Sequence, residues 1–257
     1  MISVIVPVSR NEEPFLSQAL ESINAQTHRD LEVIVETDPG ATGPAATRNR
    51  GLAKAHGEYV AFCDADDYLE PDALERMVNA IGDADMVAGS FRKFGNFEMT
   101  VRHDGGQLSM SEVAAYAMRN LRNPREHQLL SGCWAKLFRR EMVGPFPERL
   151  TTAEDMAFNY DYLMRCMSVV VVPDIVYHNR KRMQSVTTTF DPGNKPGLFG
   201  FLGGLRYVRE FLLGFYSHDE VEEAIDNSKV YHSMLYFMRI CAQQGGTMND
   251  NFKKLYP

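Results

Sequence analysis

The sequence predicts an α/β fold: a mainly parallel sheet flanked by helices, followed by a helical appendage at the C-terminus. Up to about residue 90, short apolar runs rich in β-branched residues alternate with segments of helical spacing, and the connections are short. This alternation is typical of parallel sheets, because a crossover between parallel strands usually contains a helix. From Pro196 onward the apolar residues recur with helical spacing alone, which indicates helices without strands.

The first half of the chain divides into distinct elements. Pro44 and Pro71 suit the first turn of a helix, where the missing N–H of proline costs nothing. Residues 37–44 are rich in Gly, Pro and Thr and form a loop. We expect strands over residues 2–8, 31–35, 59–63 and 86–88, and helices over residues 13–26, 44–56 and 71–81.

After residue 90 the alternation loosens. The expected elements are a hairpin over 91–101, a helix over 109–121 capped by Ser109 or Ser111, a helix over 152–166, and strands over 169–172 and 175–177. The bend at Asp191-Pro192-Gly193 is the expected boundary between a domain of residues 1–192 and a helical extension of residues 193–257.

The composition excludes several classes of protein. The formal charge of −7 argues against nucleic acid as a partner, since phosphate backbones recruit basic surfaces. The four cysteines lack the Cys-x-x-Cys spacing of zinc sites and show no disulfide framework, which fits a reducing cytoplasm. We expect no signal peptide, and no run reaches the ~20 apolar residues of a membrane-spanning helix.

Three carboxylates directly follow the third expected strand. Asp64 and Asp66 are two residues apart, so in an extended segment both side chains face the same way. In open α/β sheets, ligands bind at the carboxyl ends of the strands. Carboxylate oxygens suit Mg²⁺ or Mn²⁺ shared with a substrate phosphate. Asp67 has a simpler alternative, the capping of the next helix. The sequence therefore predicts a metal site for a phosphorylated substrate.

Several ordered motifs resemble family-2 glycosyltransferases, which have the GT-A fold. The opening residues 3–8 and 11–13, the segment 46–53 followed by 57–62, the Asp64-Ala65-Asp66 motif and the acidic motif at 154–158 match that family in order. The resemblance covers roughly residues 2–190. It implies transfer of a sugar from a nucleotide-diphosphate donor, with UDP as the expected nucleotide, with Mn²⁺ or Mg²⁺ and with inversion at the anomeric carbon.

The resemblance also implies roles for single residues. Asp155 would be the general base that takes the proton of the acceptor hydroxyl, and Glu154 would orient the acceptor or the base. The metal ligands would be Asp66, Asp64 and, as an additional ligand, His178, although a lone histidine is usually not one. The nucleotide-sugar site would include Pro7, Val8, Glu36, Asp38, Arg48, Asp64, Ala65, Lys136, Trp134, Arg180, Arg182 and Ser185.

Some of these residues have simpler explanations. Arg48 is as often a surface arginine as a ligand contact, and Lys136 is as often a structural strand residue. A lone tryptophan such as Trp134 is more often a core residue. Arg180, Arg182 and Ser185 belong to a basic segment that would donate to the diphosphate oxygens. The loop with Glu36 and Asp38 departs from the acidic pair followed by Gly-Ser that is common in the family. This departure leaves the identity of the base open.

Other functions compete with the glycosyltransferase. A haloacid-dehalogenase-type phosphatase would place its Asp-x-Asp near the N-terminus, and a nucleotidyltransferase would open with a glycine-rich loop, which the segment from Ile5 to Arg10 lacks. A non-catalytic sugar-nucleotide or glycan-binding protein would not need the acidic motif at 154–158. Neither a P-loop nor G-x-G-x-x-G is present.

The resemblance divides the expected domain into a nucleotide-sugar half, residues 1–100, and an acceptor half, residues 101–192. It leaves the acceptor open, as a glycan, a lipid-linked molecule or a protein. The helices after residue 193 can serve as a homo-oligomer interface, contact a membrane peripherally at its cytoplasmic face, or cover the core. Packing is the default for an apolar helical stripe.

Overall fold

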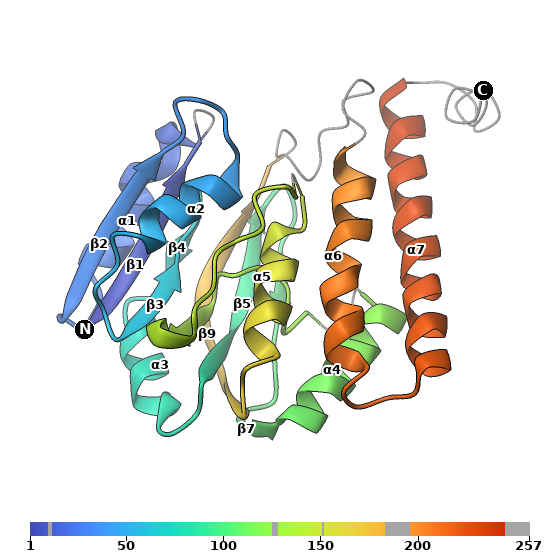
Figure 1. The fold of residues 1–257 in the computed structure, drawn as a ribbon. Coiled ribbons are helices and arrows are strands. Elements are labelled where there is room, and N and C mark those ends of the chain that lie inside the picture. The colour runs from blue at the N-terminus through green and yellow to red at the C-terminus, as the bar shows by residue number, and fades with distance from the viewer. Residues whose placement is uncertain (10–11, 125–127, 151, 183–195, 245–257) are drawn as a thin grey trace.

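The structure is a computed structural model that describes residues 1–9, 12–124, 128–150, 152–182 and 196–244. It confirms the α/β fold: one curved sheet carries helices on both faces, and two further helices follow at the C-terminal end (Figure 1). No helix among the described residues has both the length and the apolar character needed to cross a bilayer.

The N-terminal half alternates strands and helices as predicted. Its elements are β1 (Ile2–Val8), the 3-10 turn η1 (Glu13–Phe15), α1 (Leu16–Asn24), β2 (Leu31–Thr37), α2 (Pro44–Leu52), β3 (Tyr59–Phe62), β4 (Tyr68–Leu69), α3 (Ala73–Ile81) and β5 (Met86–Gly95). The strand β4 has only two residues, too few for a sequence pattern to show.

The second half contains two short strands that were not among those expected, over residues 106–109 and 136–139. Its elements are β6 (Met99–Val101), β7 (Gly106–Ser109), α4 (Met110–Arg122), β8 (Lys136–Arg139), the 3-10 turn η2 (Arg140–Met142), α5 (Glu154–Leu163), β9 (Ser168–Lys181), α6 (Pro196–Leu212) and α7 (His218–Gln244). The predicted hairpin forms between β5 and β6, with Phe91 opposite Val101. Ser109 caps α4 in a reciprocal capping box with Glu112.

The sheet is mixed. Its strand order is β2-β1-β3-β8-β5-β9-β4, with β6 beside β5 and β7 beside β9. The strands β2, β1 and β3 are parallel, as are β5 and β9. The other described pairings are antiparallel, and each of them includes one of the strands β4, β6, β7 and β8. The parallel strands end at one edge of the sheet, the upper edge in Figure 1.

The strand β9 runs without a break where the sequence suggested two short strands. Val172 pairs with Gly89 and Ile175 pairs with Ser90, so Pro173 and Asp174 have no opposite residue. This irregularity is a bulge, which bends the strand and lets it continue beyond a proline. As a result β9 extends to Lys181 and reaches the upper edge of the sheet.

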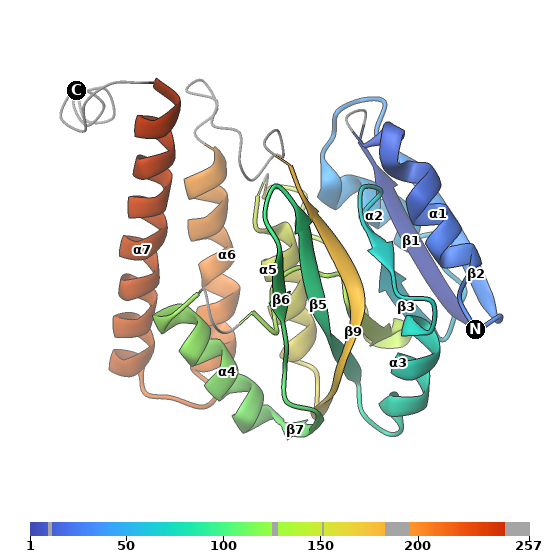
Figure 2. The ribbon, with the colours of Figure 1, turned by 180° about the vertical axis from the view of Figure 1, so that it is seen from behind.

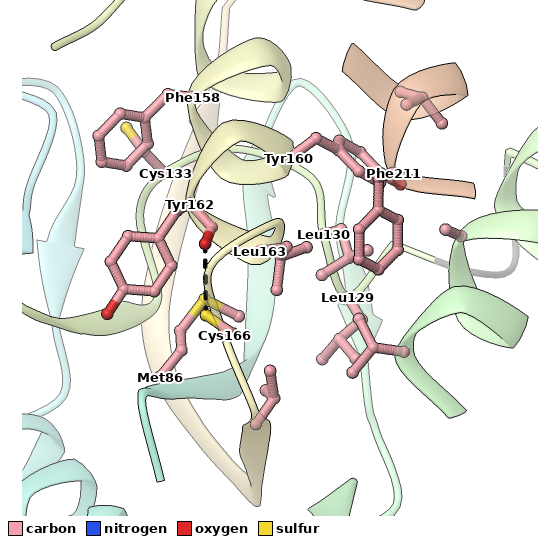
Figure 3. Packing of buried hydrophobic residues seen from close by; sticks show 14 of the residues in the cluster. Met86, Leu129, Leu130, Cys133, Phe158, Tyr160, Tyr162, Leu163, Cys166 and Phe211 are labelled. Atoms are coloured by element: carbon pink, nitrogen blue, oxygen red, sulfur yellow. Dashed lines mark hydrogen bonds between the residues drawn. The ribbon is translucent and has the colours of Figure 1, made fainter. Parts of the chain in front are cut away.

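Each face of the sheet has its own core. Figure 2 shows α1 and α3 on one face, where Ile23 and Met77 pack against Val4 and Val6. On the other face, α2, α4, α5, α6 and α7 share a single cluster of buried side chains. Figure 3 shows part of this cluster, including the contact between Tyr160 of α5 and Phe211 of α6. Both C-terminal helices therefore share a core with the elements that precede them.

Two glycines of α6 lie against the segment before α5. A Cβ added to Gly200 would lie 2.1 Å from Thr152 Oγ1 and 2.7 Å from the Thr152 carbonyl oxygen. A Cβ added to Gly203 would meet only Leu150 Cδ2, at 2.7 Å. Helix α6 therefore approaches the backbone at Thr152 as closely as a glycine allows.

We expect Gly200→Ala to destabilise the protein. The overlap with the Thr152 backbone costs ~1–3 kcal/mol, which exceeds the ~0.5–1 kcal/mol that alanine contributes inside a helix. Gly203→Ala is the control, since the end of the Leu150 side chain can move aside. Urea denaturation measures both variants, and equal free energies of unfolding would contradict this packing.

Candidate active site

The acidic cluster predicted from the sequence lies at the carboxyl edge of the sheet, just after β3. Asp64 is partly buried, and Asp66 and Asp67 are buried, with exposed fractions of 9% and 1%. The three carboxylates have different partners, and these partners decide which of them can bind a ligand.

Asp67 has a structural role. Its Oδ2 accepts hydrogen bonds from the Tyr177 hydroxyl and Asn179 Nδ2, both at 2.8 Å, and its Oδ1 accepts one from the Arg180 backbone N–H at 2.6 Å. Burial, then the charges of Asp64 and Asp66, raise the pKa of Asp67 well above its usual value. The helix-capping alternative for Asp67 is wrong, since Asp72 is the N-cap residue of α3. Asp67 instead anchors β9 to the loop after β3.

Asp66 forms an ion pair with Arg182, with Arg182 Nη2 2.6 Å from Asp66 Oδ2. The same nitrogen lies 3.7 Å from Glu12 Oε1, and the guanidinium lies over the ring of Phe15 at 5.1 Å from the centroid. Burial, followed by the charge of Asp64, raises the pKa of Asp66, and Arg182 opposes the shift. A cation therefore already stabilises the ionised form of this carboxylate.

Arg48 joins the two acidic motifs. Its Nη2 donates to Asp64 Oδ1 and its Nη1 to Glu154 Oε1, both at 2.9 Å. Only 6% of Arg48 is exposed, and its guanidinium also lies over the ring of Phe146 at 5.4 Å from the centroid. The residue therefore lies beneath the site, with both ends of the guanidinium engaged, and its position does not suit the predicted contact with a base or diphosphate.

The second acidic motif opens helix α5. Ala153, just before it, has a left-handed backbone with φ of 60°. Burial, then the charge of Asp155, raises the pKa of Glu154 to about 7, against the opposing effect of Arg48. Asp155 is only partly buried, and its Oδ1 accepts the backbone N–H of Met156 at 2.7 Å. Of the two carboxylates, Asp155 is the one that an incoming ligand can reach.

The residues fit a divalent cation that is shared with a substrate. Mg²⁺ and Mn²⁺ sites of this kind need one or two protein carboxylates, with phosphate and water as the other ligands. Asp64 and Asp66 each have one carboxylate oxygen with no hydrogen bond or ion pair to the described side chains. No group of three or more His, Cys, Asp or Glu side chains in the described part of the chain is arranged to hold a metal without a substrate.

His178 lies away from this cluster. It follows Tyr177 and precedes Asn179, whose side chains both contact Asp67, so strand alternation directs His178 to the opposite face of β9. There its Nε2 lies 2.7 Å from Glu70 Oε1, and its ring stacks on Tyr68 at 4.3 Å between centroids. This position gives no support to His178 as a metal ligand.

Trp134 and Lys136 also have structural partners. Trp134 stacks on Tyr177 at 5.1 Å between centroids and is 8% exposed. Lys136 Nζ donates to the carbonyl oxygens of Ser131 at 3.1 Å and Gly132 at 2.8 Å, and burial lowers its pKa to about 8. The simpler explanations, a core tryptophan and a structural lysine, match these contacts.

The predicted nucleotide residues surround the ends of β1 and β2. Pro7 and Val8 are buried at the end of β1, and Val8 accepts the backbone N–H of Asp38 at 3.1 Å. Asp38 also accepts hydrogen bonds from its own loop, from Thr42 at 2.7 and 2.9 Å and from Gly43 at 2.8 Å. Burial raises the pKa of Asp38, but these hydrogen bonds outweigh it and lower the pKa overall. Asp38 therefore holds the loop.

The remaining predicted residues divide between this loop and the basic segment. Glu36 pairs with Lys54, and Ala65 is fully buried between the two aspartates. Arg180 Nε donates to the Asp66 carbonyl oxygen at 2.8 Å, and its guanidinium lies between the rings of Phe15 and Phe94. Ser185 lies outside the described residues.

The sequence did not reveal four residues beside the cluster: Glu12, Tyr177, Asn179 and Lys181. The alternation of Tyr177, Asn179 and Lys181 along one strand would have placed them on one face, but the predicted strand ended at Tyr177. Burial lowers the pKa of Lys181, and Asp67, then Asp64, Asp66 and Asp155, oppose the shift. The negative charges of these four carboxylates therefore act on Lys181.

We expect Arg48→Met to cost about 3–5 kcal/mol of stability, because it leaves Asp64 and Glu154 buried without their shared cation. Arg50→Met is the matched control on the same helix. The Arg50 side chain is 39% exposed, its ion-pair partners lie 3.7–3.8 Å away and its hydrogen bonds are 3.0–3.2 Å long, so the loss of these surface contacts costs about 0–1 kcal/mol. Similar urea midpoints for the two variants would contradict the bridging role of Arg48.

Comparison with known sequences identifies relatives of this chain. Residues 35–143 match the family model described as glycosyl transferase family 2. EpsH of Bacillus subtilis, named as a glycosyltransferase, is 28% identical over 221 residues, which cover 74% of this chain and 63% of EpsH. The cholesterol galactosyltransferase of Borreliella burgdorferi is 24% identical over 239 residues, with 77% and 64% covered. The chain thus spans slightly less than two thirds of the length of these relatives.

Solved structures share the fold. TarS of S. aureus, residues 1–349 in complex with UDP-GlcNAc, superposes with a TM-score of 0.66 at 20% identity, over 87% of this chain and 70% of that one. The same TarS segment in complex with UDP gives a TM-score of 0.63. This chain is therefore similar to family-2 glycosyltransferases in sequence, over residues 35–143 and along the curated relatives, and to TarS in fold.

Proposed function

We propose that this chain transfers a hexosyl group from a UDP-sugar to an acceptor hydroxyl, with a divalent metal ion and with inversion at the anomeric carbon. The observation that carries the proposal is the bridge from Asp64 through Arg48 to Glu154. It links the Asp64-Ala65-Asp66 motif, which resembles the donor motif of the family, to the acidic motif at 154–158, which resembles the motif of the acceptor side. A transferase needs both, because the donor and the acceptor must meet at one carbon atom.

The donor side of the proposal rests on charge and on the relatives. Asp64 and Asp66 would hold the metal ion, which, when bound, neutralises the charge that develops on the departing diphosphate. Arg180 lies near the end of the adjacent strand β9, and Arg182, which directly follows the strand, contacts Asp66. Their positive charges favour a diphosphate there. TarS, which shares the fold, was crystallised with UDP and with UDP-GlcNAc, and this supports UDP as the nucleotide.

The acceptor side rests on Asp155. A single displacement with inversion needs one base opposite the leaving group, close to the acceptor hydroxyl. Asp155 is the more accessible carboxylate of the second motif, whereas Glu154 is held beneath it by Arg48. Asp155 would accept the proton as the hydroxyl oxygen attacks, and Glu154 would keep Asp155 in place.

Incubation with a panel of UDP-sugars and Mn²⁺ tests the activity itself. Release of UDP, or transfer to a simple glycoside, supports a transferase. Tight binding without turnover under all conditions supports a non-catalytic sugar-nucleotide-binding protein. Formation of a nucleotide sugar from a sugar phosphate and a nucleoside triphosphate supports a nucleotidyltransferase.

We expect Asp66→Asn to weaken Mn²⁺-dependent binding of UDP by about tenfold or more, because the amide loses the charge that holds the metal ion. Isothermal titration with and without Mn²⁺ measures the effect. Asp226→Asn, on α7, changes the net charge equally and is expected to bind as the wild type does. An unchanged affinity in Asp66→Asn would remove Asp66 from the metal site.

We expect Asp155→Asn to bind UDP as well as the wild type does and to lose about 10²–10⁴-fold in transfer rate, the range of general-base catalysis. Single-turnover assays with a saturating donor isolate this step from binding. A transfer rate close to that of the wild type would exclude Asp155 as the base.

A further inference from the structure

Two lysines at the edge of the sheet lack a role in the proposed chemistry as described so far. Lys93 lies near the end of β5, and Lys181 is the last residue of β9. Both side chains are half-buried. Neither ammonium group forms an ion pair with another described residue, although lysines that leave the solvent are usually paired.

The strand register places both lysines on the face that carries the site. Lys93 pairs with Asn179, and Lys181 follows Asn179 by two residues, so all three side chains point to the same side. Asn179 donates to Asp67, which identifies that side as the one facing the acidic cluster. In Figure 1 the ends of β5 and β9 lie at the upper edge of the sheet, the same end at which α6 begins.

The two lysines differ in what they face. The negative charges of Asp67, then Asp64, Asp66 and Asp155, oppose the lowering of the pKa of Lys181 by burial. Lys93 faces no carboxylate that counters its charge. Burial, and then the charge of Lys181, lowers its pKa to about 8. Its Nζ donates to Gln128 Oε1 at 2.5 Å and lies 5.7 Å from the centroid of the Phe91 ring, and both partners are neutral. The positive charge at Lys93 is therefore without a counter-ion among the described residues.

We propose that Lys93 and Lys181 form a binding site for a phosphate group of the acceptor, beside the proposed base Asp155. Two ammonium groups that repel each other are stabilised by an anion between them, and lysine binds phosphate as a point charge. The positions favour the acceptor over the donor. Lys93 lies opposite Asn179, three residues before Arg182, the cation at the donor motif. The assignment of this phosphate to the acceptor rests on the proposed function, whereas the binding of a phosphate by the two lysines does not.

Gln128 completes the site from the second half of the chain. It is 8% exposed and lies in the segment between α4 and β8. The same segment is tied to α5, because Asn159 Nδ2 donates to the carbonyl oxygens of Leu130 at 3.0 Å and Gly132 at 2.7 Å. An anion on Lys93 would thus be held by the elements that also position Asp155, which would set the distance between the acceptor phosphate and the reacting hydroxyl.

The test is the binding of methyl phosphate to protein saturated with UDP and Mg²⁺, measured by isothermal titration. We expect the wild type to bind, and Lys93→Met and Lys181→Met each to bind about tenfold more weakly or worse, since each removes a charge-assisted hydrogen bond. Lys93→Arg keeps the charge and is expected to retain binding. Lys229→Met, on α7, is the control with the same change of net charge. Methyl glucoside 6-phosphate is expected to bind where methyl glucoside does not.

Several outcomes would overturn the proposal. One is the absence of binding to the wild type, and another is an equal loss of affinity in Lys229→Met. A third is binding of methyl phosphate only when UDP is absent, which would assign the lysines to the donor diphosphate. If the protein fails to bind UDP, the proposed function fails instead. The phosphate site is then decided by the same titrations without nucleotide, comparing the wild type with Lys93→Met. Thermal denaturation of each variant shows whether it is folded.

Discussion

The arrangement of the site depends on one buried cation. Arg48 comes from α2, Asp64 from the loop after β3, and Glu154 from the first turn of α5, so three distant parts of the chain meet at its guanidinium. Taking such charges out of water costs several kcal/mol per ion, and only close, well-directed hydrogen bonds offset that cost. Both contacts are 2.9 Å long. The two acidic motifs are therefore held at a fixed separation, whatever ligand is bound.

This bridge leaves the site with an excess of negative charge. Arg48 and Arg182 face the carboxylates of Asp64, Asp66, Glu154 and Asp155, with Glu12 close by. The raised pKa values of Asp66, Glu154 and Glu12 show that burial and mutual repulsion already work against full ionisation. The proposed divalent cation, arriving with a diphosphate, would relieve the repulsion between Asp64 and Asp66.

The sequence predicted those features that local patterns encode. The run from Tyr59 to Phe62 followed by Asp64 and Asp66 was enough to predict a strand with an acidic cluster at its carboxyl end. The bulge at Pro173 was not predictable, because a proline ordinarily ends a strand, and so β9 was expected as two short strands. The second was expected to end at Tyr177, before the polar and basic residues 178–182. Because the expected strand ended before Asn179 and Lys181, the sequence did not predict that their side chains lie on the same face of the sheet.

Residue type alone also could not distinguish a residue that contacts a ligand from a buried residue that holds the site in place. Arg48, Trp134 and Lys136 belong to motifs that resemble a donor site, yet each is buried behind the residues that a ligand can reach. Their partners are an acidic pair, the ring of Tyr177 and backbone carbonyls, and none of these follows from sequence spacing. Exposure distinguishes them from Asp155, and exposure is a property of the assembled fold.

The C-terminal helices contribute to the site by position. Gly200 and Gly204 of α6 bring that helix against Thr152 and Ala153, where the chain takes a left-handed turn just before Glu154. A non-glycine residue with positive φ is strained and persists only when its surroundings hold it. α6 supplies part of that support, and it shares a core with α5 through Phe211 and Tyr160. The orientation of Asp155 therefore depends on α2 through Arg48 and on α6 through this packing. A substitution in either helix would thus alter the position of the proposed base, although the substituted residue does not contact a substrate.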